Sequence, residues 1–149
     1  AIFVVSCAAP RRLQIQRYIP QGTIRVVVDR EHKNLTAVLT PQRLNAVVES
    51  LKKRIAHEIA KHARNEINAM ANSAAKIAES QLGPIVVAAK LEAETEQHAE
   101  LERLQVLAKV NPNIRADEIE YRKRYAAELL EHLAHTQLKL DAVRVVLAT

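Results

Sequence analysis

Residues 101–120, LERLQVLAKVNPNIRADEIE, end one long amphipathic helix and begin another. Pro112 has no amide hydrogen and disfavours a helical backbone at Asn111, so the first helix must end there. Asp117, Glu118 and Glu120 then place negative charge in the opening turn of the next helix, where the helix dipole stabilises it. The stretch therefore predicts a helical hairpin with a defined corner.

The segment before this corner has a helical pattern for about seventy residues. Thr40 followed by Pro41 is typical of a helix N-terminus, with a capping hydroxyl before a proline at the first helical position. Apolar residues then recur every three or four positions along one face, namely Leu44, Val48, Leu51, Ile55, Ile59, Ile67, Met70, Ala74 and Ile77. The dipeptide Gly83-Pro84 predicts a break or a kink. We expect a long helical hairpin over residues 40–110, with its first helix packed as an arm on its second.

The N-terminal part has the pattern of strands. Apolar and polar residues alternate in residues 13–18, as in a strand with one covered face, and residues 23–29 are rich in β-branched side chains. Pro20 and Gly22 stand second and fourth in the segment between them, which favours a type I turn. These two strands are therefore predicted to form a hairpin, with residues 1–8 as a third strand.

The predicted fold class is α+β. A small sheet is built from the strands of residues 1–39 and from a final strand over residues 143–149, which is β-branched. The sheet carries the long helical hairpin of residues 40–110 and a third helix over residues 113–142. At 149 residues we expect one domain. The start on an apolar run without a methionine suggests a fragment of a larger protein.

Charge is unevenly distributed along the chain. Up to Ser80 there are 13 Lys or Arg against 6 Asp or Glu, and from Gln81 onward 9 against 11, which together give the net charge of +5. The basic residues concentrate at Lys52, Lys53, Arg54, Lys61 and Arg64, and the acidic ones at Glu92, Glu94, Glu96, Glu100 and Glu102.

Two interpretations of this pattern stay open. In the first, the basic helix and the acidic helix complement each other across the predicted antiparallel pair. In the second, the basic face docks RNA, DNA or an acidic protein surface. Mixed-sign helical surfaces are usually solvated, which favours the first, and no aromatic residue is interleaved to stack on bases.

Histidine and tyrosine motifs are weak candidates for sites. HEIAKH, residues 57–62, resembles a zinc-protease helix motif, but its histidines are five apart and point about 140° away from each other. His132 and His135 share a face but have no cysteine pair to complete a metal site. Tyr121 and Tyr125 flank three basic residues, a pattern of a phosphate or partner patch that is more often the edge of a core.

Nucleotide chemistry is not expected in this chain. Its two glycines, Gly22 and Gly83, are too few for a phosphate-binding loop or a dinucleotide fingerprint, so no ATP site is expected. Cys7 lies in an apolar segment and suits a buried thiol. One cysteine forms no internal disulfide, which fits a reducing cytoplasm, and no apolar run approaches the roughly 20 residues of a membrane span.

Three segments carry a resemblance to a known family. They are APRRLQIQRYIPQGTIRVVVD at residues 9–29, the corner at residues 101–120, and LKLDAVRVVLAT at residues 138–149. In this order they resemble the C-terminal domain of the RapA family of bacterial RNA polymerase-associated ATPases. The resemblance implies a Swi/Snf-type, helicase-like parent that recycles RNA polymerase, with ATP and Mg²⁺ bound by a motor upstream of this chain.

The resulting hypothesis is a non-catalytic C-terminal module with a structural and docking role. Its partners would be RNA polymerase and the ATPase lobes of the parent chain, with nucleic acid reached through the parent and no membrane. Lys52, Lys53, Arg54, Lys61 and Arg64 are the candidate docking residues. The alternative is a coiled-coil stalk or adaptor such as a rotary ATPase stator subunit, and an RNA-binding module is third.

Overall fold

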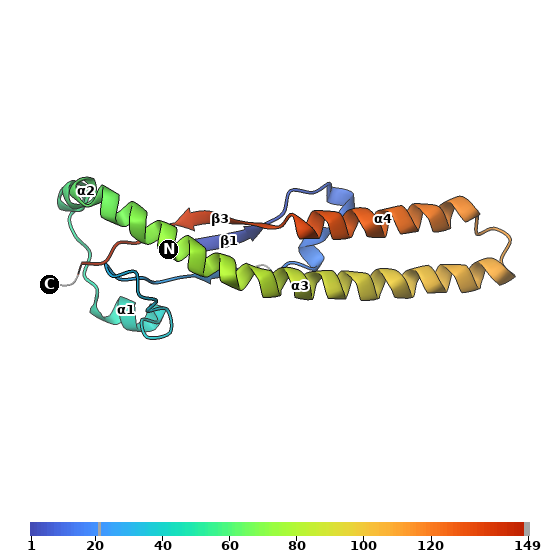
Figure 1. Ribbon diagram of the computed structural model, residues 1–149, viewed down its shortest axis with the longest axis horizontal. Coiled ribbons are helices and arrows are strands. Elements are labelled where there is room, and N and C mark those ends of the chain that lie inside the picture. The colour runs from blue at the N-terminus through green and yellow to red at the C-terminus, as the bar shows by residue number, and fades with distance from the viewer. Residues whose placement is uncertain (21, 148–149) are drawn as a thin grey trace. The chain divides into compact units, whose positions relative to one another are not determined.

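The computed structural model describes residues 1–20 and 22–147 (Figure 1). Its elements are β1 (Ile2–Ser6), two 3-10 helices η1 (Arg11–Leu13) and η2 (Ile15–Arg17), β2 (Thr23–Arg25), α1 (Pro41–Val47), α2 (Lys53–His62), α3 (Arg64–Val110), α4 (Ala116–Ala134) and β3 (Gln137–Ala142). They group into two compact units. Unit 1 contains the described residues of 1–4, 23–81 and 138–149, and unit 2 those of 5–22 and 82–137. That the two units act as one domain stays a prediction.

Unit 1 is built around a three-stranded sheet in which β1 lies between β2 and β3. β1 pairs antiparallel with β2, with Phe3 opposite Ile24. The amino group of Ala1 extends this pairing by donating to the carbonyl oxygen of Val26 at 2.8 Å. β3 runs in the direction opposite to β1 (Figure 1). N-terminal strands and a C-terminal strand thus share one sheet, and the predicted α+β class is confirmed.

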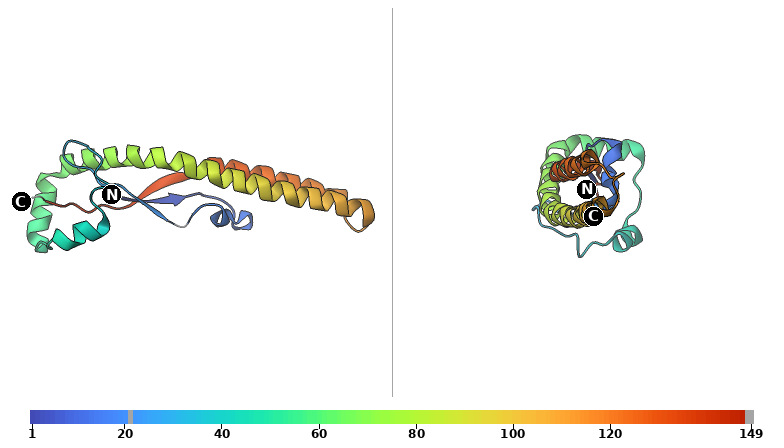
Figure 2. Two further views of the ribbon diagram at one scale, coloured as in Figure 1. Left: turned by 90° about the horizontal axis from the view of Figure 1, so that it is seen from below. Right: turned by 90° about the vertical axis from the view of Figure 1, so that its right-hand side faces the viewer.

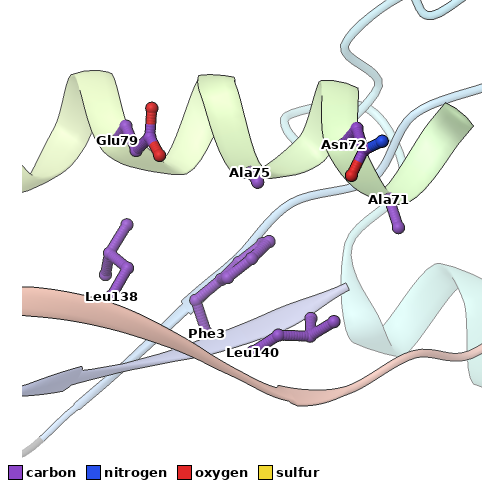
Figure 3. A pocket seen from close by; sticks show the side chains of 7 residues that line it. All are labelled: Phe3, Ala71, Asn72, Ala75, Glu79, Leu138 and Leu140. Carbon is purple, nitrogen blue, oxygen red and sulfur yellow. The ribbon is translucent and has the colours of Figure 1, made fainter. Parts of the chain in front are cut away.

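One face of this sheet packs on the first third of α3. Phe3, 3% exposed, and the β3 side chain of Leu140 point toward the small residues of the helix (Figure 3). Ala74 and Ala78 are almost fully buried, because side chains this small allow the helix backbone to approach the sheet. A pocket of about 260 Å³ remains between the helix and the strands.

Helix α1 begins where the sequence predicts. The Thr40 hydroxyl accepts a hydrogen bond from the amide of Arg43 at 3.3 Å, and Pro41 occupies the first helical position. The helix ends after two turns at Val47, and α2 follows. Neither α1 nor α2 buries any residue.

Helix α3 corrects the predicted hairpin of residues 40–110. Gly83 and Pro84 lie inside this single 47-residue helix and do not break it, so its two parts cannot pack on each other as antiparallel partners. Both residues are exposed, so the proline ring faces solvent and the carbonyl left without an amide donor can be hydrated. Losing one backbone hydrogen bond at Pro84 costs less free energy than losing the packing contacts that α3 would give up if it ended there.

The corner at Asn111–Pro112 is confirmed. α3 ends at Val110, and the amide of Asn113 is satisfied by the Asn111 side chain at 3.0 Å. α4 begins at Ala116 with Asp117 and Glu118 in its first turn. The Glu118 carboxylate accepts from the amide of Arg115 at 3.5 Å. α3 and α4 lie antiparallel and side by side in unit 2, so they form the helical hairpin of the molecule (Figures 1 and 2).

Residues 13–18 are not a strand. Their amides bond locally, as in Leu13 to Pro10 and Tyr18 to Ile15, both at 3.0 Å, and these bonds form η1 and η2. Gln14 has a left-handed backbone with φ of 47°, which turns the chain so that Leu13 and Ile15 both point inward. The predicted turn around Pro20 includes Gln21, which lies outside the described residues.

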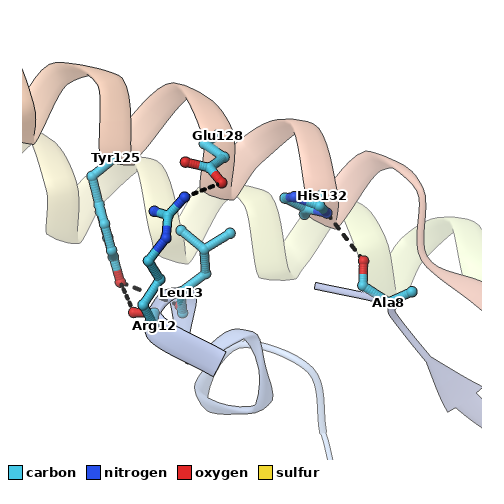
Figure 4. A network of polar contacts seen from close by, with 6 residues as sticks. All are labelled: Ala8, Arg12, Leu13, Tyr125, Glu128 and His132. Atoms are coloured by element: carbon cyan, nitrogen blue, oxygen red, sulfur yellow. Dashed lines mark hydrogen bonds and ion pairs between the residues drawn. The ribbon is translucent and has the colours of Figure 1, made fainter. Parts of the chain in front are cut away.

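The inward side chains of this segment build the core of unit 2. Leu13 and Ile15 pack with Leu129 and Leu133 of α4 and with alanines 89 and 93 of α3. Polar contacts hold the same segment on α4 (Figure 4). The Tyr125 hydroxyl shares its one proton between the carbonyl oxygens of Arg12 and Leu13, each 3.3 Å away, so Tyr125 lies at the edge of the core.

The C-terminal elements begin and end earlier than predicted. α4 ends at Ala134 instead of near residue 142, and the final strand is Gln137–Ala142 instead of 143–149. Of the predicted strand, residues 143–147 follow β3 without regular structure, and residues 148–149 lie outside the described part. Leu138 and Leu140 line the pocket beside Phe3, so pairing with β1 and packing against α3 outweigh the β-propensity of the valines that follow.

Candidate docking surface

Five basic residues, Lys52, Lys53, Arg54, Lys61 and Arg64, were predicted to dock a partner, and we call them the basic surface. Lys52 is the N-cap residue of α2, and the helix itself carries Lys53, Arg54 and Lys61. Arg64 begins α3. All five are exposed, and all lie in unit 1. The structure therefore places them on consecutive turns of one short stretch of chain.

The geometry of α2 separates its charged side from its apolar side. At about 100° per residue, Lys53, Arg54 and Lys61 fall within roughly 100° of arc on one side of the helix. Ile55 and Ile59 fall on the other side. α2 buries none of its residues, and the three cations on its basic side are exposed.

No ion pair neutralises the basic surface within residues 1–20 and 22–147, although α2 also carries Glu58. Arg30, also in unit 1, does pair with Glu66. Unit 1 as a whole holds 12 Lys or Arg against 7 Asp or Glu, whereas unit 2 holds 10 of each. The net charge of the molecule, +5, therefore belongs to unit 1.

The interpretation that the acidic residues complement this surface across a helix pair is wrong in its geometry. That pair required residues 41–82 to fold back on residues 85–110, and α3 runs through both. Three of the five acidic residues, Glu96, Glu100 and Glu102, have partners of their own within unit 2. Glu96 pairs with Arg17 at 2.8 Å, and Glu100 pairs with Arg103 at 2.7 Å. The Arg103 hydrogen bonds lower the pKa of Glu100.

Three of the four histidines in these motifs contact backbone carbonyl oxygens. The Nδ1 atoms of His62 and His135 lie 2.7 and 2.8 Å from carbonyl oxygens one turn earlier in their helices. His132 Nδ1 lies 3.1 Å from the carbonyl oxygen of Ala8 (Figure 4). Cys7 is half-buried against the unit 2 core, and its thiol donates to the carbonyl oxygen of His132 at 2.9 Å. Within residues 1–20 and 22–147, no cluster of three or more His, Cys, Asp or Glu is arranged to hold a metal ion.

Sequence analysis missed the ion pairs and hydrogen bonds that join the η1–η2 segment to both helices of unit 2. Arg12 pairs with Glu128 at 2.5 Å, and the Tyr18 hydroxyl donates to Glu96 at 2.5 Å. Burial and the Glu96 carboxylate raise the pKa of Tyr18. These partners are about 80 to 115 residues apart in sequence, so no local pattern could indicate them. None of the helices described is both long and apolar enough to cross a bilayer.

Comparison with known proteins identifies the family. The family model described as "RNA polymerase recycling family C-terminal" matches residues 1–148. The RNA polymerase-associated protein RapA of Yersinia enterocolitica is 34% identical over 148 residues, which is 99% of this chain and 15% of that protein. The RapA proteins of Yersinia pestis and Yersinia pseudotuberculosis are each 32% identical over the same shares. The chain thus spans about 15% of the length of these curated relatives, and it belongs to the RNA polymerase recycling family as its C-terminal domain.

Proposed function

We propose that this chain is the non-catalytic C-terminal module of a RapA-like, ATP-dependent RNA polymerase recycling factor, and that its basic surface docks an acidic surface of RNA polymerase. Family membership supports the parent's identity, because the relatives are named as RNA polymerase-associated proteins. It argues against a rotary ATPase stalk. ATP and Mg²⁺ would bind a motor elsewhere in the parent, and the protein would act in the cytoplasm.

One observation carries the docking role. The exposed cations of the basic surface have no acidic partner among the described residues, on a unit with a net charge of +5. Unpaired charge of one sign on a surface steers and orients an oppositely charged partner.

An acidic protein surface suits these cations better than nucleic acid does. Residues 52–64 contain no Phe, Tyr or Trp on which a base could stack. Leu51, 51% exposed, directly precedes Lys52, and Ile55, 48% exposed, lies on the other side of α2; both are suited to contact apolar side chains of a protein. Mixed apolar and charged contacts are typical of protein interfaces.

The test is a charge reversal in the full-length protein. Lys52, Lys53 and Arg54 are changed together to Glu, and affinity for RNA polymerase is measured at two salt concentrations. We expect affinity to fall at least about tenfold at low salt, and the loss to shrink as salt rises, because exposed charges are screened beyond about 8 Å at physiological ionic strength.

A matched control reverses three other exposed cations, Arg11, Lys76 and Arg124. It changes net charge by the same amount and should leave polymerase affinity unchanged. Melting temperature is recorded for both variants. Unchanged polymerase affinity in the Lys52, Lys53 and Arg54 variant would overturn the proposal, and an accompanying loss of nucleic-acid affinity would assign the surface to RNA or DNA instead.

A further inference from the structure

Strand β3 has a single neighbour in the sheet of unit 1. The strand order β2-β1-β3 places it at an edge, and within residues 1–20 and 22–147 its backbone pairs with that of β1 alone. Lys139, Asp141 and Ala142 are exposed, and Leu140 is 46% exposed. At every second residue of an edge strand the amide and carbonyl groups point away from the sheet. β3 therefore offers unpaired donors and acceptors to a further strand.

The chain that follows β3 also carries uncovered apolar side chains. Residues 143–147 have no regular structure. Their exposed apolar residues, each 43 to 48% exposed, are Val143, Val145, Val146 and Leu147. β-branched residues favour strands, where the side chains of neighbouring strands cover them. The edge of the sheet and its continuation thus share a surface suited to an added strand.

One flank of helix α3 faces the edge of the sheet that is opposite to β3. Ser73 Oγ lies 2.9 Å from His32 Nδ1, and Glu66 pairs with Arg30. Arg30 and His32 belong to the loop that follows β2, the other edge strand. Glu66 and Ser73 fall within about 20° of each other around the helix. This flank of α3 therefore lies on the β2 side of the sheet.

The opposite flank of α3 carries the pocket of about 260 Å³. Ala75 and Glu79 lie about 180 to 220° around the helix from Glu66, which places them on the β3 side. Both line the pocket together with Leu138 and Leu140 of β3. Figure 3 shows the Leu138 side chain directed from the strand toward the helix. The pocket and the free edge of β3 thus lie side by side within unit 1.

Glu79 adds a negative charge to this pocket. Its side chain is exposed and forms no ion pair with any described residue. Apart from Asn72, the other lining residues are apolar. A strand that pairs with β3 places alternate side chains on the face of the sheet that bears the pocket. The site therefore fits a segment with an apolar residue for the pocket and a Lys or Arg two positions away for Glu79.

We propose that an extended segment of the parent chain, outside the part represented here, adds a strand along β3, inserts an apolar side chain into the pocket and places a Lys or Arg at Glu79. The chain spans 15% of the length of the RapA relative, so most of such a parent lies outside it. A bare edge with exposed apolar side chains pairs with other strands and promotes aggregation. A tethered segment covers the edge permanently because its effective concentration is high, whereas a separate partner leaves it bare after each dissociation. The proposed contact depends on family membership and not on the basic surface.

The test is hydrogen exchange of the full-length protein, resolved to single residues by mass spectrometry. If the segment pairs with β3, all amides of residues 138–142 should exchange at least about tenfold more slowly than in an unstructured chain. A bare edge gives alternation instead, with slow exchange for amides directed at β1 and fast exchange for those directed away from it. That alternation in the full-length protein would overturn the proposal. Protection of the outward amides only after RNA polymerase is added would also overturn it, because the edge would then belong to another protein.

A photo-cross-linker identifies the segment that lies beside the edge. Lys139→p-benzoylphenylalanine places the reactive group on the face of β3 opposite Leu138 and Leu140, at an exposed position. Irradiation of the full-length protein alone should join residue 139 to a peptide of the same chain outside residues 1–149. A covalent dimer on a denaturing gel would assign the edge to a second copy, and a link within residues 1–149 would show that this chain covers its own edge. Either result would overturn the proposal.

Two variants of the full-length protein test the pocket. Ala75→Phe fills it and should raise exchange of the outward β3 amides at least about tenfold, whereas Ala88→Phe, at an exposed position of the same helix, should leave exchange unchanged. Protected β1 amides in both variants show that the sheet is intact. Glu79→Lys changes only an exposed charge and should raise the same exchange at least about twofold, with Glu94→Lys as its control on α3. Unchanged exchange of β3 in both pocket variants would overturn the proposal.

Discussion

Unit 2 and unit 1 use their side chains differently. In unit 2, Leu13 and Ile15 of the 3-10 segment join Leu129 and Leu133 in one buried cluster, and acidic and basic residues are equal in number. In unit 1, α1 and α2 bury no residue, and basic residues outnumber acidic ones by five. Unit 2 is therefore organised around its own core, whereas much of unit 1 presents exposed apolar and cationic side chains to solvent.

The largest expected effect comes from the unit 2 core. Leu129→Ala removes a side chain with no exposed surface and should lower the free energy of unfolding by about 2 to 5 kcal/mol, through lost burial and the cavity left behind. The matched change in unit 1, Ile55→Ala at a side chain 48% exposed, should change it by no more than about 0.5 kcal/mol. Urea unfolding of both variants measures the contrast. Equal losses would mean that α2 is supported by packing as much as α4 is.

The next largest effects come from two prolines, whose replacement should change the free energy of unfolding in opposite directions. Pro84→Ala restores an amide donor inside α3 and should stabilise the chain by about 1 to 3 kcal/mol. Pro112→Ala removes a constraint at the corner and should destabilise it by about 0.4 to 1 kcal/mol. Thermal unfolding compares the two, and amide exchange at residues 111–115 should rise only in the Pro112 variant. A destabilising Pro84→Ala would show that the helix depends on a bend at that residue.

The smallest effect is a pH dependence confined to unit 2. Burial first, and then the Glu96 carboxylate, raise the pKa of Tyr18 above its ordinary value of 10.0. The folded chain therefore holds this proton more tightly than the unfolded chain. The resulting stability is fully present below pH 10 and is lost as pH rises from 10 through the folded pKa. Unfolding measured from pH 8 to pH 11 should show a steeper alkaline decline in the native chain than in Tyr18→Phe, and parallel curves would contradict this account.

The corner between α3 and α4 could be predicted because its signals are local. Asn111-Pro112 stops a helix and Asp117 with Glu118 favours the start of the next, and both effects act within a few residues. The alternation in residues 13–18 was misleading for a related reason. Leu13 and Ile15 do point to the same side, but a left-handed Gln14 between two 3-10 turns achieves this as well as a strand does.

The same distinction between local and long-range signals applies to the candidate sites. The basic surface follows from the spacing of lysines and arginines within thirteen residues, so its place on helical segments could be predicted, whereas its partner could not. The polar contacts of the η1–η2 segment could not be predicted at all. Tyr18 bonds Glu96 and Gln97 of α3, nearly eighty residues later in the sequence, and these contacts depend on how the 3-10 segment packs on the helix.

The chain crosses between the two units four times, after residues 4, 22, 81 and 137. Three of these crossings fall within or at the end of regular elements, since β1, α3 and β3 each contribute residues to both units. No single deletion, duplication or recombination event can therefore separate one unit from the other and leave both intact. Over evolutionary time the pair should be inherited as a block, gaining or losing residues at solvent-facing loops such as the Asn111–Pro112 corner and not at the crossings.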